Sequence, residues 1–286
     1  KANVPKGVIN IVHGTGECVG EVLTKHPLIN AISFIGSTRT GKKIFENCSK
    51  TIKRMTLELG GKSPTILLED ANFKDAIPHI FSSAYSNSGQ ACHAGSRLLV
   101  PKHKLEGVEQ LLLDYIHTLN IGDPKSETTQ LGPMINQKQF DTVQSYIKSG
   151  IDEGAKLLCG GLGKAEGFEK GYFVKPTIFI CHDQNLKIVQ EEIFGPVLCV
   201  LPYENEQDAL IMANNTMFGL SAYVFSNDKA KALAFARHIR SGRVLINTST
   251  SKAKHPPFGG MKQSGLGRMG GRYSMDAFSE IKSILF

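Results

Sequence analysis

Residues 31–59 read AISFIGSTRTGKKIFENCSKTIKRMTLEL. The apolar run 31–35 predicts a strand, the segment GST at 36–38 opens a helix that continues to about residue 48, and 55–59 predicts a further strand. A strand, a helix and a strand in succession are typical of a parallel sheet flanked by helices. We therefore expect an α/β fold.

The same alternation extends toward the N-terminus. Residues 8–12 predict another strand, and 20–25 predict a short helix. Three strands are fewer than an open dinucleotide-binding sheet usually has, and the chain begins with Lys1 rather than Met. We expect the chain to be part of a longer polypeptide.

Beyond residue 60 a second α/β unit is expected, without an internal repeat. Helices are predicted at 72–85, 104–119, 136–153, 206–214 and 229–239, and strands at 97–100, 173–179, 197–202, 222–225 and 244–247. Asn72 is the predicted N-cap of its helix, with Asp75 three residues on. A glycine-rich loop follows at 256–271, and 277–286 alternates enough to be a strand or an arm.

Composition excludes several classes of protein. The 286 residues are 41% apolar and 21% charged, with 29 glycines, which is typical of a globular core. The longest uncharged stretch, 76–96, holds five serines and is too polar for lipid, so we expect a soluble protein that does not enter a membrane. The net charge is +7, but the basic residues are scattered, which favours solubility and attraction of anionic metabolites over nucleic-acid binding.

Cysteine spacing indicates the compartment. The six cysteines stand at 18, 48, 92, 159, 181 and 199. None forms a CxxC pair, and no histidines have HxxxH spacing, so no metal site is predicted. Separate cysteines in a chain of this length indicate a reducing compartment, and we expect a cytoplasmic protein in which at most one thiol is reactive.

Three short segments could carry chemistry. Cys92 lies in a glycine-bracketed loop, NSGQACHAGSR at 87–97, where a substrate could approach it, although composition alone favours a buried structural cysteine. His93 is adjacent, but neighbouring side chains generally point apart, so it is not assigned as the base. Glu58 stands between leucines at a strand end, so desolvation is expected to raise its pKa; the alternative is a salt bridge with Lys62.

The third segment is FIGSTRTG at 34–41. A strand followed by Gly-Ser-Thr and a helix start presents free backbone N–H groups to a phosphate. A simple helix N-cap explains the same pattern equally well.

Taken in order, these segments resemble the aldehyde dehydrogenase superfamily. The matching motifs are FIGSTRTG at 34–41, LELGGKSP at 57–64, NSGQACHAGSR at 87–97, QEEIFGPV at 190–197 and PPFGGMKQSGLGR at 256–268. Five motifs in family order across the chain make the resemblance highly specific. It implies an aldehyde-dehydrogenase-like fold: an incomplete dinucleotide-binding parallel sheet, an α/β catalytic domain and a C-terminal oligomerisation strand. The corresponding domains are 1–60, 61–263 and 264–286.

The resemblance also implies site residues. Cys92 matches the nucleophile and Glu58 the general base, and Asn87 holds a conventional place in the cysteine loop, where its role could be structural. The main-chain amide of Cys92 would supply one oxyanion donor. The residues implied to bind NAD or NADP are Gly36, Ser37 and Gly41 (pyrophosphate), Leu59 (carboxamide, through its backbone), Glu192 (nicotinamide ribose) and Phe194 (nicotinamide).

The implied reaction converts an aldehyde to a carboxylic acid. A Cys92 thiohemiacetal would become a thioester, which water activated by Glu58 hydrolyses. Family members are longer at the N-terminus and have a second oxyanion donor there; losing one such donor costs about 10²–10³ in kcat, so we expect these residues alone to be nearly inactive. Two alternatives remain: a CoA-acylating dehydrogenase, disfavoured by Glu58, and a non-catalytic subunit or fragment.

Partners are only partly indicated. Segment 277–286 resembles the part that adds a strand to a neighbouring subunit in this family, so a homodimer or homotetramer is expected. Lys252 and Lys254 point weakly to an anionic aldehyde. The particular small-molecule aldehyde, and the choice between NAD and NADP, are not determined by the sequence.

Overall fold

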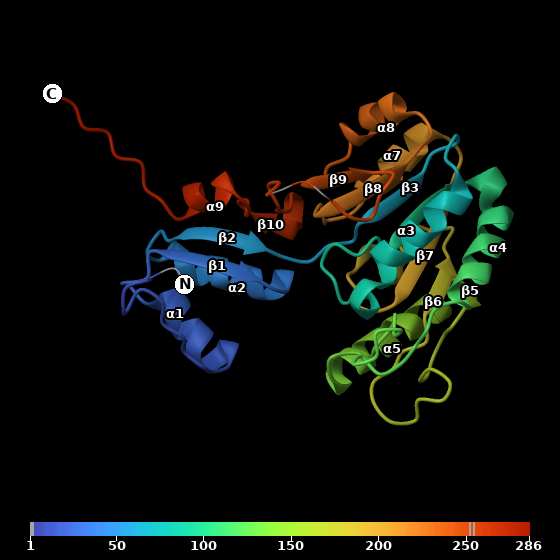
Figure 1. Ribbon diagram of the computed structural model, residues 1–286, viewed down its shortest axis with the longest axis horizontal. Coiled ribbons are helices and arrows are strands. Elements are labelled where there is room, and N and C mark those ends of the chain that lie inside the picture. Colours follow the sequence, from blue (N-terminus) through green and yellow to red (C-terminus); the bar gives the residue numbers. More distant parts are fainter. Residues whose placement is uncertain (1–2, 252, 254) are drawn as a thin grey trace.

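A computed structural model describes residues 3–251, 253 and 255–286. Its strands form two separate sheets, one of three strands and one of seven (Figure 1). The hint from Lys252 and Lys254 concerns residues outside the described part.

The small sheet is built from the segment that opened the sequence analysis. Strands β1 (Ala31–Ile35) and β2 (Arg54–Glu58) are parallel and joined by α2 (Thr38–Ser49). A short strand, β10 (Gly265–Leu266), pairs antiparallel with the end of β2. The predicted strand, helix and strand are confirmed.

Helix α2 is positioned by its cap and by its apolar face. The Ser37 side chain accepts the Thr40 N–H, which satisfies one of the free donors of the first turn. Ile44 and Cys48 pack in one buried cluster with Leu57 and Leu59. The cluster holds α2 against β2 and so fixes the loop between β1 and α2.

The large sheet has the strand order β5-β6-β7-β4-β3-β8-β9, and all neighbours are parallel except β5 with β6. The strands are β3 (Pro64–Leu67), β4 (Arg97–Pro101), β5 (Lys156–Cys159), β6 (Thr177–Ile180), β7 (Val197–Tyr203), β8 (Ser221–Phe225) and β9 (Arg243–Ile246). The central strands β3, β4 and β8 are buried throughout, as expected of a sheet covered on both faces.

Helices cover the two faces of this sheet (Figure 1). Side chains of α3 (Phe73–Tyr85) and α4 (Leu105–Ile116) share one buried cluster with the sheet. The opposite cluster takes side chains from α5 (Gln137–Asp152), α6 (Lys187–Gln190), α7 (Glu206–Asn214) and α8 (Lys229–Ala236). The predicted N-cap of α3 is confirmed, since the Asn72 side chain accepts the Asp75 N–H.

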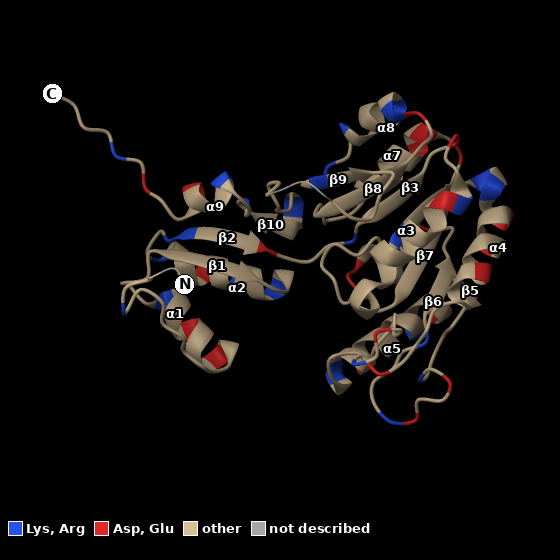
Figure 2. Ribbon diagram, in the orientation of Figure 1, with Lys and Arg blue, Asp and Glu red and all other residues tan. Residues whose placement is uncertain are grey.

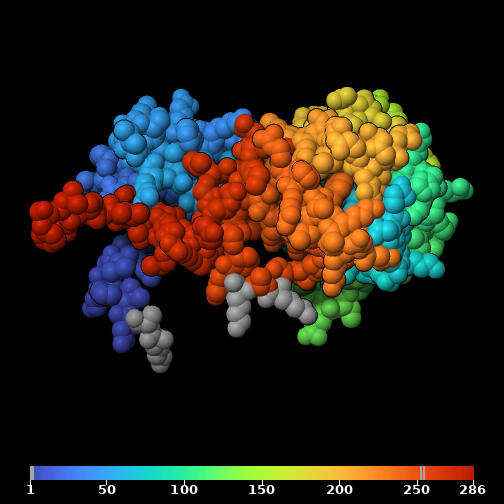
Figure 3. All heavy atoms as spheres, turned by 90° about the horizontal axis from the view of Figure 1, so that it is seen from above, coloured from blue at the N-terminus to red at the C-terminus, as the bar shows by residue number. Residues whose placement is uncertain are grey.

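Shorter elements complete the described chain. They are η1 (Gly16–Gly20), α1 (Glu21–Lys25), η2 (Ser86–Gly89), η3 (Lys102–Lys104), η4 (Lys262–Ser264) and α9 (Arg272–Ala277). After β9 the chain returns to the small sheet, where residues 265–266 pair with β2. Figure 3 shows this C-terminal part of the chain, in orange-red and red, between the two parts of the molecule.

Several predictions about elements were wrong. Residues 8–12 form no strand, and four of their side chains (Val8, Ile9, Ile11 and Val12) are 64–79% exposed. A strand needs a neighbour to satisfy its backbone groups, and no described strand pairs with this segment. The strand predicted at 173–179 begins only at Thr177. Strands β3, β5 and β10 were not predicted.

The C-terminal segment is an arm and not a strand. Helix α9 ends at Ala277, and 278–286 has no regular structure and extends away from the body (Figure 1). Figure 2 shows basic and acidic residues intermingled over both parts, in keeping with the scattered charge predicted above. Among the described helices, none combines the length and apolarity that a bilayer crossing requires.

Candidate active site

The predicted residues gather where the carboxyl ends of β1 and β2 face the amino ends of β3 and β4. Glu58 is the last residue of β2, and the register pairs it with Ile35 at the end of β1. Cys92 precedes β4, and Pro64 at the start of β3 pairs with Arg97 of β4. The chain crosses between the sheets through residues 59–63 (Figure 1).

Glu58 is a buried carboxyl group with no hydrogen-bond partner in the described part of the chain. Its side chain is 2% exposed, and neither carboxylate oxygen accepts a hydrogen bond from any described residue. Burial raises its pKa to about 7, and the positive charge of Arg268 opposes this rise. The predicted upward shift is confirmed, and the alternative salt bridge with Lys62 is wrong.

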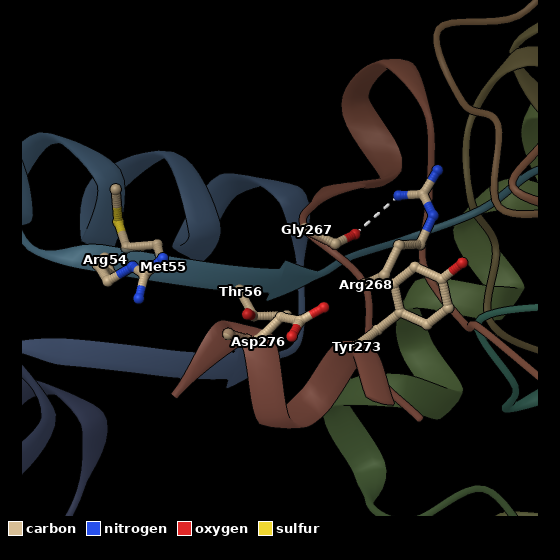
Figure 4. A pocket seen from close by; sticks show the side chains of 8 residues that line it. Arg54, Met55, Thr56, Gly267, Arg268, Tyr273 and Asp276 are labelled. Carbon is tan, nitrogen blue, oxygen red and sulfur yellow. Dashed lines mark hydrogen bonds between the residues drawn. The ribbon is translucent and has the colours of Figure 1, made fainter. Parts of the chain in front are cut away.

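Arg268 was missed by sequence reasoning because it lies 210 residues beyond Glu58 in the chain. Its Nη1 donates to the carbonyl oxygens of Gly260 at 2.9 Å and Gly267 at 2.7 Å, which fixes the guanidinium. It lines a hollow of about 460 Å³ between β2 and α9. Figure 4 shows the side chains around this hollow, with Arg268 beside Tyr273. None of the residues predicted from sequence lines this hollow.

Cys92 lies in a turn between η2 and β4 and is partly buried. Burial raises the pKa of its thiol, and the negative charges of Glu192 and Glu58 raise it further, whereas the N–H groups of Cys92 and His93 lower it. The Sγ atom is 3.9 Å from Nδ1 of His93, so these neighbours do touch. Burial and then Arg243 lower the pKa of His93, which favours its neutral form.

The cysteine loop is held by unusual backbone geometry. Asn87 and Ser88 have φ of 52° and 56°, in the left-handed region that few residues other than glycine adopt. The exposed Asn87 side chain donates to the Gln90 carbonyl at 3.0 Å. Its amide therefore stabilises the loop, which agrees with the structural role left open above.

Glu192 lies in the segment before β7, and its side chain contacts the crossing between the two sheets near Cys92. Its Oε1 accepts the Gly61 N–H at 3.2 Å. Burial raises the pKa of this carboxyl group, while the Gly61 N–H and Lys62 lower it. Phe194 is 37% exposed, with φ of 56°, and its carbonyl accepts a hydrogen bond from Gln139 at 2.9 Å. This backbone leaves the aromatic ring partly open to solvent.

The predicted phosphate turn lies beside Glu58. The Gly36 N–H donates to the Glu58 carbonyl at 3.0 Å, and Gly36 and Ser37 are exposed at the start of α2. A Cβ on Gly41 would lie 2.6 Å from Cδ2 of Leu59, so this glycine lets α2 approach the end of β2 closely. Leu59 itself is buried, and its N–H donates to the Ser264 carbonyl at 2.9 Å.

Lys62 is a second residue whose place the sequence did not indicate. It is 1% exposed, its Nζ has no hydrogen-bond partner among the described residues, and burial lowers its pKa. Its positive charge lowers the pKa of Glu192.

The remaining cysteines divide by burial. Cys48, Cys181 and Cys199 are buried, as a structural assignment predicts, Cys159 is intermediate and Cys18 is exposed. No group of three or more potential metal ligands occurs in the part of the chain that the structure describes.

The fold and the order of the motifs along the chain point to one class of protein. The model of the aldehyde dehydrogenase family matches residues 1–284, and the chain belongs to this family. A relative from Staphylococcus haemolyticus, whose name places it among the aldehyde dehydrogenases, is 49% identical over 284 residues, which are 99% of this chain and 60% of that protein.

Solved structures agree. A crystal structure of an NAD-dependent aldehyde dehydrogenase from Sinorhizobium meliloti has a TM-score of 0.95 and 41% identity, over 99% of this chain and 56% of that one. Aldehyde dehydrogenase C from Pseudomonas syringae, a cysteine-to-alanine mutant in complex with NAD⁺ and octanal, has a TM-score of 0.91 and 43% identity, over 93% and 55%. The chain thus spans about 60% of the length of the curated relatives it matches.

Proposed function

We propose that the whole protein oxidises an aldehyde to a carboxylic acid with NAD, using Cys92 as nucleophile and Glu58 as general base. One observation carries the proposal. A partly buried thiol lies within the electrostatic reach of a buried carboxyl group that has a pKa of about 7 and no hydrogen-bond partner among the described residues. A base with a pKa near the working pH is the most effective at taking a proton from water.

In the first step the Cys92 sulfur adds to the aldehyde carbon. The thiol gives its proton to the Glu58 carboxylate, which passes it to solvent. The new carbon–sulfur bond forms, and the carbonyl oxygen becomes the oxyanion of a thiohemiacetal. The backbone N–H of Cys92 is the proposed donor to this oxygen. Because burial and two neighbouring carboxylates raise the thiol pKa, proton removal is the step that this site must assist.

The described residues fit a nicotinamide dinucleotide. Gly36 and Ser37 expose the N-terminus of α2 to a pyrophosphate, and Glu192 offers a carboxylate to ribose hydroxyls beside the partly open ring of Phe194. Bound NAD⁺ supplies the acceptor for the hydride that leaves the thiohemiacetal carbon. Gly41 and Leu59 set how closely the turn approaches Glu58.

Hydrolysis then depends on Glu58. Water gives a proton to the Glu58 carboxylate and attacks the thioester carbon, the carbon–sulfur bond breaks, and the Cys92 thiolate returns with release of the acid. Solved neighbours crystallised with NAD⁺, one of them also with octanal, support the choice of cofactor and of an aldehyde substrate.

The test measures products of the whole protein. We expect one acid and one NADH for each aldehyde consumed, at a rate that added CoA does not change. Acyl-CoA as the main product would contradict the hydrolytic role of Glu58. Failure of the wild-type protein to consume any aldehyde with NAD or NADP would contradict the activity itself.

Two further proposals concern the setting of the enzyme. We propose a cytoplasmic location, supported by six free thiols. We also propose that the arm 278–286 contacts a second copy of the chain in a homodimer or homotetramer. The arm exposes a large amount of apolar surface, which a soluble protein rarely leaves uncovered. The exposed apolar residues are Phe278, Ile281, Ile284, Leu285 and Phe286.

A further inference from the structure

Two consecutive glycines, Gly60 and Gly61, form the start of the crossing between the sheets. Both are buried, and neither has a positive φ, so the backbone angles do not require glycine at either position. What requires it is space. A side chain at either position would overlap a different part of the candidate active site.

At Gly60 the space is taken by the Glu192 carboxylate. A Cβ built on Gly60 would lie 2.2 Å from Oε2 and 2.9 Å from Cδ of Glu192. The other carboxylate oxygen, Oε1, accepts the N–H of Gly61 at 3.2 Å. The carboxylate therefore rests directly on the backbone of the glycine pair.

At Gly61 the space is taken by the backbone of the nucleophile. A Cβ on Gly61 would lie 2.3 Å from the carbonyl oxygen of Cys92. A third close contact joins the two partners to each other, since a Cβ on Gly89 of the cysteine loop would lie 2.1 Å from the carbonyl oxygen of Gly195. The cavity between these segments measures only about 10 Å³, so their backbones have little room to shift.

We propose that Gly60 and Gly61 are positioning residues with separate tasks: Gly60 sets the place of the Glu192 carboxylate, and Gly61 sets the place of the Cys92 backbone. This inference rests on the proposed function, in which Glu192 binds the cofactor and Cys92 attacks the aldehyde. A single turn of chain next to Glu58 then aligns cofactor, nucleophile and base.

The two substitutions predict different results in the whole protein. In Gly60→Ala the obstructing atoms are the end of a flexible side chain, so Glu192 moves away while the fold stays. We expect NAD to bind about tenfold more weakly, the effect of losing one hydrogen bond to a charged group. Alkylation of Cys92 by iodoacetamide without cofactor is not slowed, because moving the Glu192 carboxylate away removes a negative charge that raises the thiol pKa.

In Gly61→Ala the obstructing atom belongs to the backbone of Cys92. We expect the alkylation rate of Cys92 without cofactor to change by about tenfold or more, because the thiol environment shifts with its loop. Gly107→Ala is the matched control, since this glycine lies in α4 with nothing within 4 Å of the added Cβ. It leaves NAD affinity and the alkylation rate unchanged.

A double substitution tests whether Gly60 acts through Glu192. If it does, Gly60→Ala weakens NAD binding no further in a Glu192→Ala background. Wild-type NAD affinity in Gly60→Ala, or additive losses in the double variant, overturns the task assigned to Gly60. A wild-type alkylation rate in folded Gly61→Ala overturns the task assigned to Gly61. Because alkylation needs no cofactor and no turnover, this experiment tests the task of Gly61 even if the protein does not oxidise aldehydes.

Discussion

At the scale of single residues, Glu58 combines two requirements that conflict. A general base near neutral pH needs a raised pKa, and the site provides it by burying a carboxyl group that accepts no hydrogen bond from the described residues. The same burial opposes ionisation and therefore opposes folding once the carboxyl group is charged. Activity at this position is gained at the expense of stability.

This conflict predicts a stabilising substitution. The folded-state pKa of Glu58 is raised from 4.5 to about 7, so the folded protein binds a proton that the unfolded chain releases between these values. The stability contributed by Glu58 is complete below pH 4.5 and is lost as the pH rises to about 7. Glu58→Gln avoids that loss and should stabilise the protein above pH 7 by about 1–3 kcal/mol.

Thermal melting of the whole protein at pH 5 and pH 8 measures this difference. We expect the melting temperature of Glu58→Gln to exceed that of the wild type by more at pH 8 than at pH 5. The variant also oxidises aldehyde more slowly than the wild type. An advantage of the same size at both pH values would show that Glu58 is not protonated in the folded state at pH 5.

At the scale of elements, short sequence patterns correctly predicted the helices whose ends depend on neighbouring residues in the chain. Helix α2 was located from the segment GST at 36–38 and helix α3 from its cap, Asn72. The errors concern strands, because a segment becomes a strand only if it pairs with another segment that can be far away in the chain. Residues 8–12 have the apolar pattern of a strand but no described neighbour, whereas Gly265–Leu266 lies in a glycine-rich stretch and becomes β10 because it meets Glu58 and Leu57.

The candidate active site also contains residues that the sequence indicated and residues that it did not. Its motifs are short and contiguous, so the sequence indicated Cys92, Glu58 and Glu192. Their surroundings come from distant segments, such as Arg268 beside Glu58, and spacing along the chain carries no signal for such contacts. The glycine pair was visible as a pattern, but the groups that fill the space beside it were not.

Two helix caps allow the cofactor turn to be separated from simple capping. Ser37→Ala and Asn72→Ala each remove a side chain that accepts an N–H in the first turn of a helix, and each should cost about 1 kcal/mol of stability. Only Ser37 lies in the proposed pyrophosphate turn. We therefore expect the KM for NAD to rise in Ser37→Ala and to stay unchanged in Asn72→Ala. Equal KM values for NAD in both variants would show that Ser37 only caps its helix and does not contribute to NAD binding.

At the scale of the molecule, the return of the chain from the large sheet to the small one joins the two parts. Residues 256–271 include β10, which pairs with Glu58 and Leu57 in the small sheet, and lead into α9 and the arm (Figure 1). The arm then exposes apolar side chains that nothing in the described chain covers. An interface with another copy would bury them.

Removal of residues 278–286 tests this interface. Light scattering after size-exclusion chromatography should give a dimer or tetramer for the whole protein and a smaller species for the shortened one. The matched control replaces Ser279 and Glu280 with alanine and keeps the apolar residues, and we expect it to keep the larger mass. An unchanged mass after removal of the arm would contradict its role in assembly.

The central claim is that Cys92 carries the acyl group until water activated by Glu58 removes it. Mass spectrometry of the Glu58→Gln whole protein, mixed with aldehyde and NAD and digested at low pH, tests it most directly. The account predicts a thioester on the peptide that contains Cys92, in near-stoichiometric amount, and none in the Cys92→Ala variant. An unmodified Cys92 during continued turnover, or an acyl group on another residue, would contradict it.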